Sequence, residues 1–470
     1  MRIPMPRGNL YLLRTMNTAK PPVTTLRKSL SAIHLWAITV GLVISGDYFG
    51  WSYGWGEAGT VGFLMVTLVV ALLYITFIFS FTELTTAIPH AGGPFAYALR
   101  ALGPYGGVAA GYATLIEFVF AAPAIAFALG SYIHFLYPAA SVTLVAMVGY
   151  VLFTGLNFLG IKESAMFTLF VTLLAVAELL VYMGIVAPHF SLDHFIQDAL
   201  PLSGPGMVKS IPFAIWFFLA AEGVAMVAEE VKDPHRNIPR GYIYGIITLV
   251  VLAFGVMIFT GGVGEWRRMT AMDYPLPEAI AMALGRDSKL TSLFTSIGLF
   301  GLVASFHGII ISYSRQIFAL ARSGFLPAAL AVVNRRFQTP HRALIAGGLA
   351  GMVAVLSGTT DKLIILSVIG ALTMYSLSMI SLFRLRRHAP FLPRPMRAPF
   401  YPYFPAVALI LSCACLVGIA IYNLWLTAIF VGGLAVMLLI FRLTHPGKPQ
   451  EFEDLYAPEH DNEASLIHDA

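Results

Sequence analysis

Long apolar runs recur along the whole chain, each close to the length of a membrane-spanning helix. A helix needs about 20 mostly apolar residues to cross a bilayer, and we identify twelve candidate segments. They lie at 32–56, 61–84, 105–134, 140–160, 166–187, 211–230, 241–264, 291–320, 342–358, 362–383, 404–421 and 423–442. The pattern predicts an all-α membrane protein with about 12 transmembrane helices.

The first of these runs is interrupted in its middle by Ser45, Gly46, Asp47 and Gly50. An unpaired peptide group in lipid costs several kcal/mol, so a helix unwinds there only where protein or a cavity receives its backbone. A carboxylate at that depth costs about 3 kcal/mol on insertion scales. A broken helix with an acid at the break is typical of a cation site near the midplane. Alternatively, the glycines only permit close packing and Asp47 faces a water-filled vestibule.

A second interruption lies in the sixth run, where Ala220, Ala221 and Gly223 surround Glu222. The first and sixth runs each begin a block of five helices, which we place at 32–187 and 211–383, with two extra helices at 404–442. Discontinuous helices at matching positions of two halves indicate an inverted-repeat transporter with its site at the two breaks. The sequence therefore predicts a 5+5 inverted repeat in which helices 1 and 6 are discontinuous.

The composition agrees with a membrane protein, because 58% of the residues are hydrophobic and 11% are charged, against about 25% charged in soluble domains. Basic residues are concentrated on the cytoplasmic side of membrane proteins. With the N-terminus inside, only six of the 29 lysines and arginines fall outside. These six are Lys209, Arg267, Arg268, Arg286, Lys289 and Lys362. We expect both polar tails, 1–30 and 446–470, to be cytoplasmic, a transporter domain at 31–445, and a location in the bacterial inner membrane.

The sequence contains no metal, nucleotide or nucleophile constellation typical of an enzyme. The chain has no Gly-rich phosphate loop followed by Lys and Ser or Thr, and no His-Glu-x-x-His pair. The net charge of +5 resides in short connectors between apolar runs, which does not indicate nucleic-acid binding. The two cysteines, Cys413 and Cys415, form no ligand set or disulfide framework. We expect no catalytic residues, no cofactor and no metal. Apart from the substrate, we expect the lipid bilayer to be the partner, and we expect no nucleic-acid or protein partner.

Three separated motifs resemble the amino acid–polyamine–organocation (APC) superfamily, and the first of them is the first-helix signature at residues 44–48. Residues 231–239 resemble its Glu-x-x-Pro-x-x-x-Ile-Pro connector, and residues 321–327, with Asn334 and the Thr339-Pro340 pair, match a second motif. Residues 44–51, 88–97, 115–120 and 306–310 look more narrowly like the ethanolamine permease branch. The resemblance covers about 31–445 and implies the leucine-transporter-type 5+5 fold with rocking-type alternating access.

The first break departs from the pattern of that superfamily. Amino-acid carriers of the superfamily hold the substrate carboxylate on the amides of a Gly-Ser-Gly-Ile-Phe signature. Here Ile44 replaces the first glycine and Asp47 replaces the isoleucine. Like charges about 4 Å apart repel by about 4 kcal/mol at an effective dielectric of 20. The departures favour a small primary amine without a carboxylate, and ethanolamine fits both the charge and the resemblance.

The candidate binding residues line the two breaks, with Asp47 or Glu222 facing the ammonium. They are Ser45, Gly46, Asp47, Tyr48, Trp216, Phe218, Ala220, Glu222 and Gly223. Trp216 matches an aromatic gate of related carriers and is placed for a cation–π contact of about 1–2 kcal/mol, or it packs structurally. In related antiporters a glutamate at the place of Glu222 is linked to substrate release and proton sensitivity; otherwise it stabilises the break.

Four further residues are candidates for coupling or gating. Glu117 and Glu178 are intramembrane acids, which are functional hypotheses by default, although hydrogen bonding between helices also accounts for them. Some proton-coupled relatives carry a lysine close to where Glu178 lies, and Glu178 is a candidate proton carrier in its place. His307 titrates near physiological pH when unperturbed or is structural, and His90 is a candidate for an intracellular gate.

The residues leave several functions open. An amino-acid or polyamine permease or exchanger is the nearest alternative, and a membrane sensor that binds the amine without transport is a distant one. A channel is disfavoured, because interrupted helices suit occlusion better than a continuous pore. Proton symport, exchange and uniport all remain compatible, since a monovalent cation gains about 2.3 kcal/mol per 100 mV of membrane potential without a coupled ion.

Overall fold

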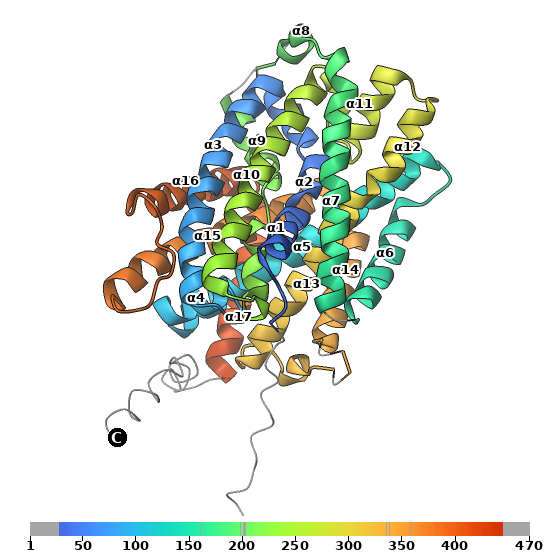
Figure 1. The fold of residues 1–470 in the computed structure, drawn as a ribbon. Helices are drawn as coiled ribbons and strands as arrows, with labels where there is room; N and C mark the ends of the chain where they lie inside the picture. The colour runs from blue at the N-terminus through green and yellow to red at the C-terminus, as the bar shows by residue number, and fades with distance from the viewer. Residues whose placement is uncertain are drawn as a thin grey trace, which may run out of the picture.

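The computed structural model describes residues 28–444, except for 160, 198, 201–203, 335, 338 and 358. Most of this part of the chain is helical, and the helices are packed into one bundle (Figure 1). The described residues form no β-strand, although an isolated parallel bridge pairs Leu30 with Val231. The predicted tails, 1–30 and 446–470, lie outside the described residues, apart from residues 28–30.

The element bounds follow the chain order. The α-helices are α1 (Ala32–Val43), α2 (Ser45–Tyr48), α3 (Ser52–Ala87), α4 (Pro94–Leu102), α5 (Pro104–Leu136), α6 (Val142–Asn157), α7 (Ile161–Val186), α8 (Leu192–Ile196), α9 (Gly204–Trp216), α10 (Pro234–Gly261), α11 (Pro275–Leu284), α12 (Lys289–Ile297), α13 (Leu299–Arg322), α14 (His341–Ser357), α15 (Thr360–His388), α16 (Tyr403–Tyr422) and α17 (Leu424–Thr444). The 3-10 helices are η1 (Ala187–His189), η2 (Ala221–Glu230), η3 (Trp266–Met269) and η4 (Ala328–Ala331).

Nine helical stretches of the described chain are long and apolar enough to cross a membrane. They are Ser52–Ala87, Pro104–Leu136, Ala165–His189, Gly204–Glu230, Pro234–Gly261, Lys289–Arg322, Thr360–His388, Tyr403–Tyr422 and Leu424–Thr444. Shorter apolar helices occupy Ala32–Tyr48, Val142–Asn157, Pro275–Leu284 and His341–Leu356. Nine of the twelve predicted segments coincide with the long stretches, while 32–56, 140–160 and 342–358 lie mainly on shorter helices. The chain is thus an all-helical integral membrane protein.

The first predicted interruption is a break between α1 and α3. After the single turn of α2, Phe49 adopts an extended conformation and Gly50 has a φ of +90°. This left-handed region favours glycine, because a Cβ atom would clash with the backbone. A Cβ at Gly50 would also lie 2.4 Å from Cδ1 of Trp216. A further bend at Gly59 (φ +66°) divides α3.

The second predicted interruption separates α9 from η2. Helix α9 ends at Trp216, a turn follows, and Ala220 takes a left-handed conformation with a φ of 73°. The chain then continues as the 3-10 helix η2 rather than as an α-helix. A left-handed alanine is rare. The surrounding packing therefore holds this break open against the local preference of the backbone.

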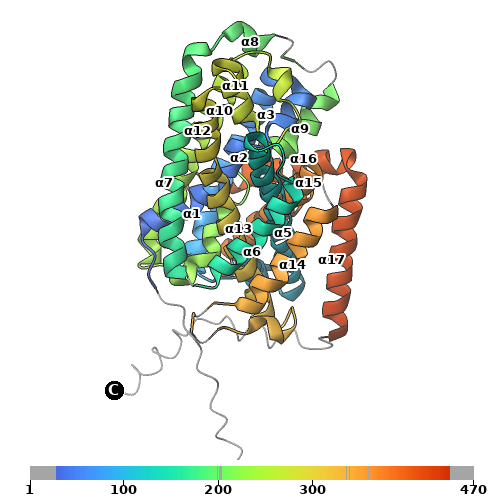
Figure 2. The same cartoon turned by 90° about the vertical axis from the view of Figure 1, so that its right-hand side faces the viewer.

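The breaks lie inside the bundle, whereas the last two helices lie at its edge. Helix α15 packs most extensively on α5, and Gly370 allows this, because a Cβ there would lie 2.6 Å from the carbonyl oxygen of Ala113. In contrast, α16 and α17 are largely exposed along their spans, and Figure 2 shows α17 at the rim. This exposure agrees with a lipid-facing position for α16 and α17.

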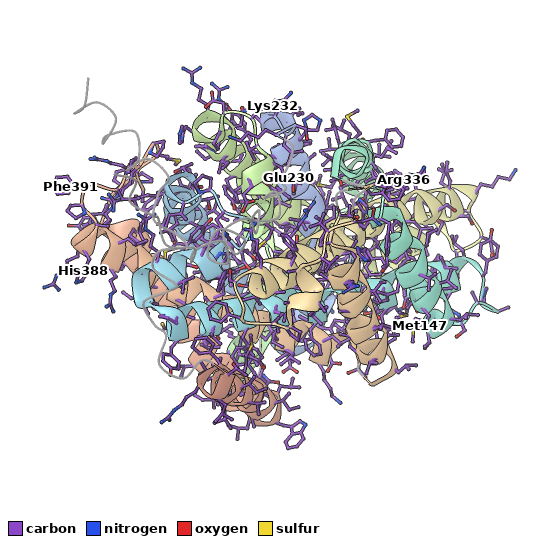
Figure 3. The ribbon with its side chains drawn as sticks, turned by 90° about the horizontal axis from the view of Figure 1, so that it is seen from below. Met147, Glu230, Lys232, Arg336, His388 and Phe391 are labelled. Carbon is purple, nitrogen blue, oxygen red and sulfur yellow. The ribbon has the colours of Figure 1, made fainter. Side chains whose placement is uncertain are left out.

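An ionic network around Glu83 joins three segments at the end of the bundle that carries α4. The buried Glu83 carboxylate at the end of α3 accepts from Nε of Arg386 at 2.9 Å, and also from Nη2 of the same arginine. Nε of Arg394 lies 3.1 Å from Oε1 of Glu83, and the amide of Ala398 donates to Oε2 at 2.7 Å. Figure 3 views this end, with His388, the last residue of α15, and Phe391 of the connector that follows it at the rim.

We predict that Glu83→Gln destabilises the fold. Removing one member of a buried ionic network leaves uncompensated charge, which typically costs about 3–5 kcal/mol. The matched control is Glu265→Gln, which breaks the exposed pair with Arg268 and should cost below about 1 kcal/mol. Thermal unfolding of the purified protein in detergent measures both, and equal losses of stability would contradict a structural role for the network.

Candidate functional site

The two helix breaks touch each other in the centre of the bundle. A Cβ at Gly46 would lie 2.5 Å from the carbonyl oxygen of Trp216 and 2.9 Å from Cα of Phe217. The Trp216 ring packs edge-on against Phe49 with ring centroids 5.4 Å apart. Its indole N–H has no acceptor among the described residues. The structure therefore brings the predicted residues Gly46 and Trp216 into direct contact.

Ser305 of α13 satisfies backbone groups that the first break exposes. Its hydroxyl accepts from the amide of Ser45 at 2.9 Å and donates to the carbonyl of Gly41 at 2.7 Å. A hydroxyl thus bridges a donor and an acceptor where α1 ends. Ser305 was not among the residues predicted from the sequence. A small hydroxyl residue directly before the Phe306-His307-Gly308 motif was its only signal.

Asp47 is fully buried next to this contact. Neither carboxylate oxygen has a hydrogen-bond partner among the described residues. The Asp47 main-chain carbonyl is satisfied, because it accepts from Nε1 of Trp51 at 3.1 Å. An isolated buried carboxylate is too costly to remain ionised without a counterion. The side chain is therefore suited to take up a proton or a cation.

Glu222 at the second break belongs to a chain of tyrosine hydroxyls. Tyr375 of α15 donates to Oε2 of Glu222 at 3.0 Å, and its oxygen lies 3.0 Å from the hydroxyl of Tyr74 on α3. Tyr242 of α10 donates to the main-chain carbonyl of Glu222 at 2.9 Å. The ring of Phe218 packs on Tyr74 at 5.3 Å. None of these three tyrosines was predicted from the sequence. The one feature that could have pointed to them is a hydroxyl group within an apolar run.

The structure also brings Glu117 of α5 to Glu222. The two side chains lie close enough to interact directly, and the amide of Ala220 faces the Glu117 carboxyl group. No hydrogen bond of normal geometry engages either oxygen of Glu117. The adjoining residues are also in contact range, because a Cβ at Gly223 would lie 3.5 Å from Cζ of Phe118. Glu117 was predicted as a coupling residue, without a predicted neighbour.

Tyr48 and Glu178 form a separate cluster. The hydroxyl of Tyr48 donates to Oε2 of Glu178 at 2.8 Å, and its oxygen lies 3.0 Å from the carbonyl oxygen of Ala175. Tyr132 of α5 donates to the carbonyl of Tyr48 at 3.0 Å, and Oε1 of Glu178 has no partner among the described residues. Tyr48 thus links the first break to α7, and its hydroxyl is engaged with Glu178.

The two candidate histidines lie apart from the breaks. Nδ1 of His307 is 3.0 Å from Nδ2 of Asn157, and its ring packs on Phe167. His90 lies between α3 and α4, where its Nε2 is 3.0 Å from Nη2 of Arg322. The same Arg322 nitrogen donates to Oε1 of Glu229 at 3.0 Å. His90, Glu229 and Arg322 therefore link the α3–α4 connector, η2 and α13, and we call them the end latch.

A small cleft lies between α1, α7, η2 and α13. Its empty volume, about 340 Å³, includes open solvent. The residues that line it are Ile38, Ala165, Thr168, Gly223, Val227, Gly308, Ile311 and Ser312. Its lining contains none of the buried acids, so the cleft and the acidic groups are different features. Within the described residues, no group of three His, Cys, Asp or Glu side chains could hold a metal ion.

Comparison with known proteins identifies the family that this chain resembles. The amino acid permease family model matches residues 30–441. An uncharacterised transporter of Rhizobium meliloti is 27% identical over 85% of this chain and 88% of its own length. The methylthioribose transporter of Bacillus subtilis is 26% identical over 85% of this chain and 91% of its own. A branched-chain amino acid permease of Bacillus subtilis is 25% identical over 89% and 93% respectively. These names point to transporters rather than enzymes.

We predict that Gly46→Ala impairs binding and transport together. The added methyl group would overlap the Trp216 carbonyl at 2.5 Å, and fixed backbone cannot move aside cheaply, so the two breaks must separate. Losses of about 1–3 kcal/mol are typical of such overpacking. The control is Gly184→Ala in α7, where an added Cβ would meet nothing within 4 Å. Substrate binding by the purified variants tests this, and normal binding by Gly46→Ala would contradict the close contact.

We predict that the end latch loses stability as the pH falls. Burial lowers the pKa of His90 to about 4; Glu229 acts in the opposite direction, and Arg322 lowers it further. Between about pH 6.5 and pH 4, the unfolded chain therefore binds a proton that the folded protein does not, and the folded state is destabilised. The loss is on the order of 1–3 kcal/mol.

His90→Gln provides the reference for this measurement, because glutamine does not titrate. Unfolding in detergent at a series of pH values should show the wild-type protein losing more stability than His90→Gln on going from pH 7 to pH 4.5. Parallel pH profiles for the two proteins would show that His90 contributes nothing to the pH dependence.

Proposed function

Since this chain belongs to the amino acid permease family, we propose that it is a secondary active transporter for a small primary amine, most specifically ethanolamine. It imports this amine across the bacterial inner membrane by alternating access. The relatives named above differ in the substrates that their names state, so membership of the family does not by itself determine the substrate. The proposal rests on the chemistry of the two helix breaks.

The proposed architecture is a 12-helix, 5+5 inverted repeat with α16 and α17 outside the repeat, and with both termini in the cytoplasm. The positions of the breaks support it, because α1–α2 and α9–η2 each begin a block of five predicted helices. The start of α1 and the end of α17 lie toward the same end of the bundle (Figure 1), which fits an even number of crossings. The two blocks would rock around the contact between Gly46 and Trp216.

The observation that carries the proposed substrate is the buried, unpartnered carboxylate of Asp47. Asp47 is the next residue after Gly46, which contacts the second break. Both of its carboxylate oxygens are available to an ammonium group. The indole N–H of Trp216 also lacks an acceptor, so it can donate to the hydroxyl of ethanolamine, and its ring can contact the ammonium. In this proposal the amine contacts Asp47 or Glu222 and backbone groups at 45–47 and 220–223.

The backbone at the first break offers little to a substrate carboxylate. The amide of Ile44 donates to Val40, that of Ser45 to Ser305, and that of Asp47 to Ile44. These donors are therefore already occupied by the protein. A carboxylate placed here would also lie close to the Asp47 side chain, which would repel it. Both features favour an amine over an α-amino acid.

The proposal predicts saturable uptake of radiolabelled ethanolamine into proteoliposomes. Unlabelled primary amines of similar size should compete, whereas excess alanine, choline or putrescine should compete weakly. Inhibition by alanine as strong as that by ethanolamine would favour an amino-acid permease instead. Binding to the purified protein without accumulation in the vesicles would favour a sensor.

We expect Asp47→Asn to weaken ethanolamine binding by at least about tenfold, because the lost charge attraction exceeds about 1.4 kcal/mol. The matched control is Glu57→Gln, which neutralises a half-exposed acid at an ion pair with Lys209 and should leave the affinity unchanged. Equilibrium binding of ethanolamine to the folded, purified variants measures both. An unaltered affinity in Asp47→Asn would show that its carboxylate does not hold the ammonium.

A further inference from the structure

Glu117 and Glu222 form a pair of buried acids without a basic neighbour. Both side chains are fully inaccessible to solvent. Both oxygens of Glu117 and Oε1 of Glu222 lack a hydrogen-bond partner among the described residues, and only Tyr375 donates to the remaining oxygen. The two carboxyl groups lie close enough to influence each other's charge. Their unpartnered oxygens thus face the same small region beside Ala220.

The packing of α5 and α15 holds this pair in place. Ser367 of α15 donates to the main-chain carbonyl of Glu117 at 2.7 Å. A Cβ at Gly370 would lie 2.9 Å from the amide nitrogen of Glu117, so the two helices are in close contact at this level. Further along α15, Tyr375 reaches Glu222. One helix therefore contacts both members of the pair.

The other groups around the pair are neutral or engaged elsewhere. Tyr74 of α3, Tyr242 of α10 and Tyr375 of α15 are phenols, and Cys415 of α16 lies beyond Tyr74. On α13, Arg315 pairs with Glu230, and His307 lies against Asn157. In the described chain, no lysine or arginine forms an ion pair with Glu117 or Glu222. The positive charge that the pair requires must therefore be supplied from outside the fold.

We propose that Glu117 and Glu222 act as one site that holds a single shared proton and exchanges it for the ammonium group of the substrate. Two adjacent buried carboxylates cannot both ionise without a cation, so the empty site keeps one proton and a net charge of −1. Of the two positions that the proposed function allows for the ammonium, at Asp47 or at Glu222, the exchange concerns the one at Glu222: when the ammonium reaches it, the proton leaves and the two glutamate carboxylates hold one monocation. The net charge is −1 again, so the apolar surroundings experience the same charge in both states.

This inference rests on the proposed function for the identity of the ammonium compound, but the shared proton does not depend on it. Infrared difference spectroscopy of the purified protein detects the carbonyl stretch of protonated carboxyl groups as the pH is raised, with no substrate present. We expect one component of this band to disappear in a single titration step that is altered in both Glu117→Gln and Glu222→Gln. Its midpoint should move to lower pH by about one to three units in Glu117→Gln, because the neighbouring negative charge is gone.

Two controls separate this pair from other acids. Glu57→Gln, at the partly exposed ion pair with Lys209, should leave the titration unchanged. Tyr375→Phe removes the donor to Oε2 of Glu222 while both acids remain, so it should raise the midpoint. A titration in folded Glu117→Gln that matches that of the wild-type protein would overturn the proposal.

Calorimetry then tests the exchange itself. Ethanolamine is added to the wild-type protein in buffers of different ionisation enthalpy, which reports the number of protons released per amine bound. We expect release of about one proton below the titration midpoint and less than half of that in Glu117→Gln. Absence of binding heat with an intact infrared step would refute ethanolamine as the substrate and leave the pair standing. Binding without proton release, or with equal release in the variant, would refute the exchange.

Discussion

The structure depends on one constraint, which is that backbone groups released inside a membrane must find partners within the protein. Water is absent there, so each break requires dedicated side chains to replace the missing helical hydrogen bonds. Ser305 serves the amide of Ser45 at the first break, and Tyr242 serves the carbonyl of Glu222 at the second. Each break therefore requires a hydrogen-bonding residue on the helix that lies opposite it, which is α13 for the first break and α10 for the second.

Close contact between the breaks adds a second requirement, which glycine meets. Gly46 lies against the Trp216 carbonyl, and Gly50 lies against the Trp216 ring. Larger residues at either position would force the two broken helices apart. The same contact buries Asp47 without a partner. Backbone geometry and electrostatics are therefore coupled here, since the packing that permits the break also isolates the acid.

Charges are arranged differently in the middle and at the α4 end of the bundle. At that end, the acids have arginine partners, as in the pairs Glu83 with Arg386 and Glu230 with Arg315. Figure 3 shows Glu230 inside this end and Lys232 at its edge. Near the breaks, Asp47, Glu117 and Glu222 have no basic partner in the described residues. Ion pairs can hold the elements together at the α4 end of the bundle. The acids near the breaks have no such partner, so a proton or a cation is needed to neutralise them.

The sequence by itself determined the membrane class, the positions of most helices and the location of both breaks. These features follow from local properties, since apolar length and misplaced glycines or acids are readable along the chain. It also marked Asp47, Glu117, Glu178 and Glu222 as unusual, because a charge within an apolar run is costly wherever it points.

Only the tertiary structure decided which of these groups meet. It joined Glu117 to Glu222 across α5 and η2 and gave Glu178 to Tyr48. It also placed Ser305 and Tyr375 at the breaks. The sequence does not show which way a serine or tyrosine side chain in an apolar run points. That direction depends on the rotation of the helix and on contacts with residues far away in the sequence. The local sequence indicates that a buried polar group needs a hydrogen-bond or charge partner. The packing of helices distant in the sequence determines which residue provides that partner.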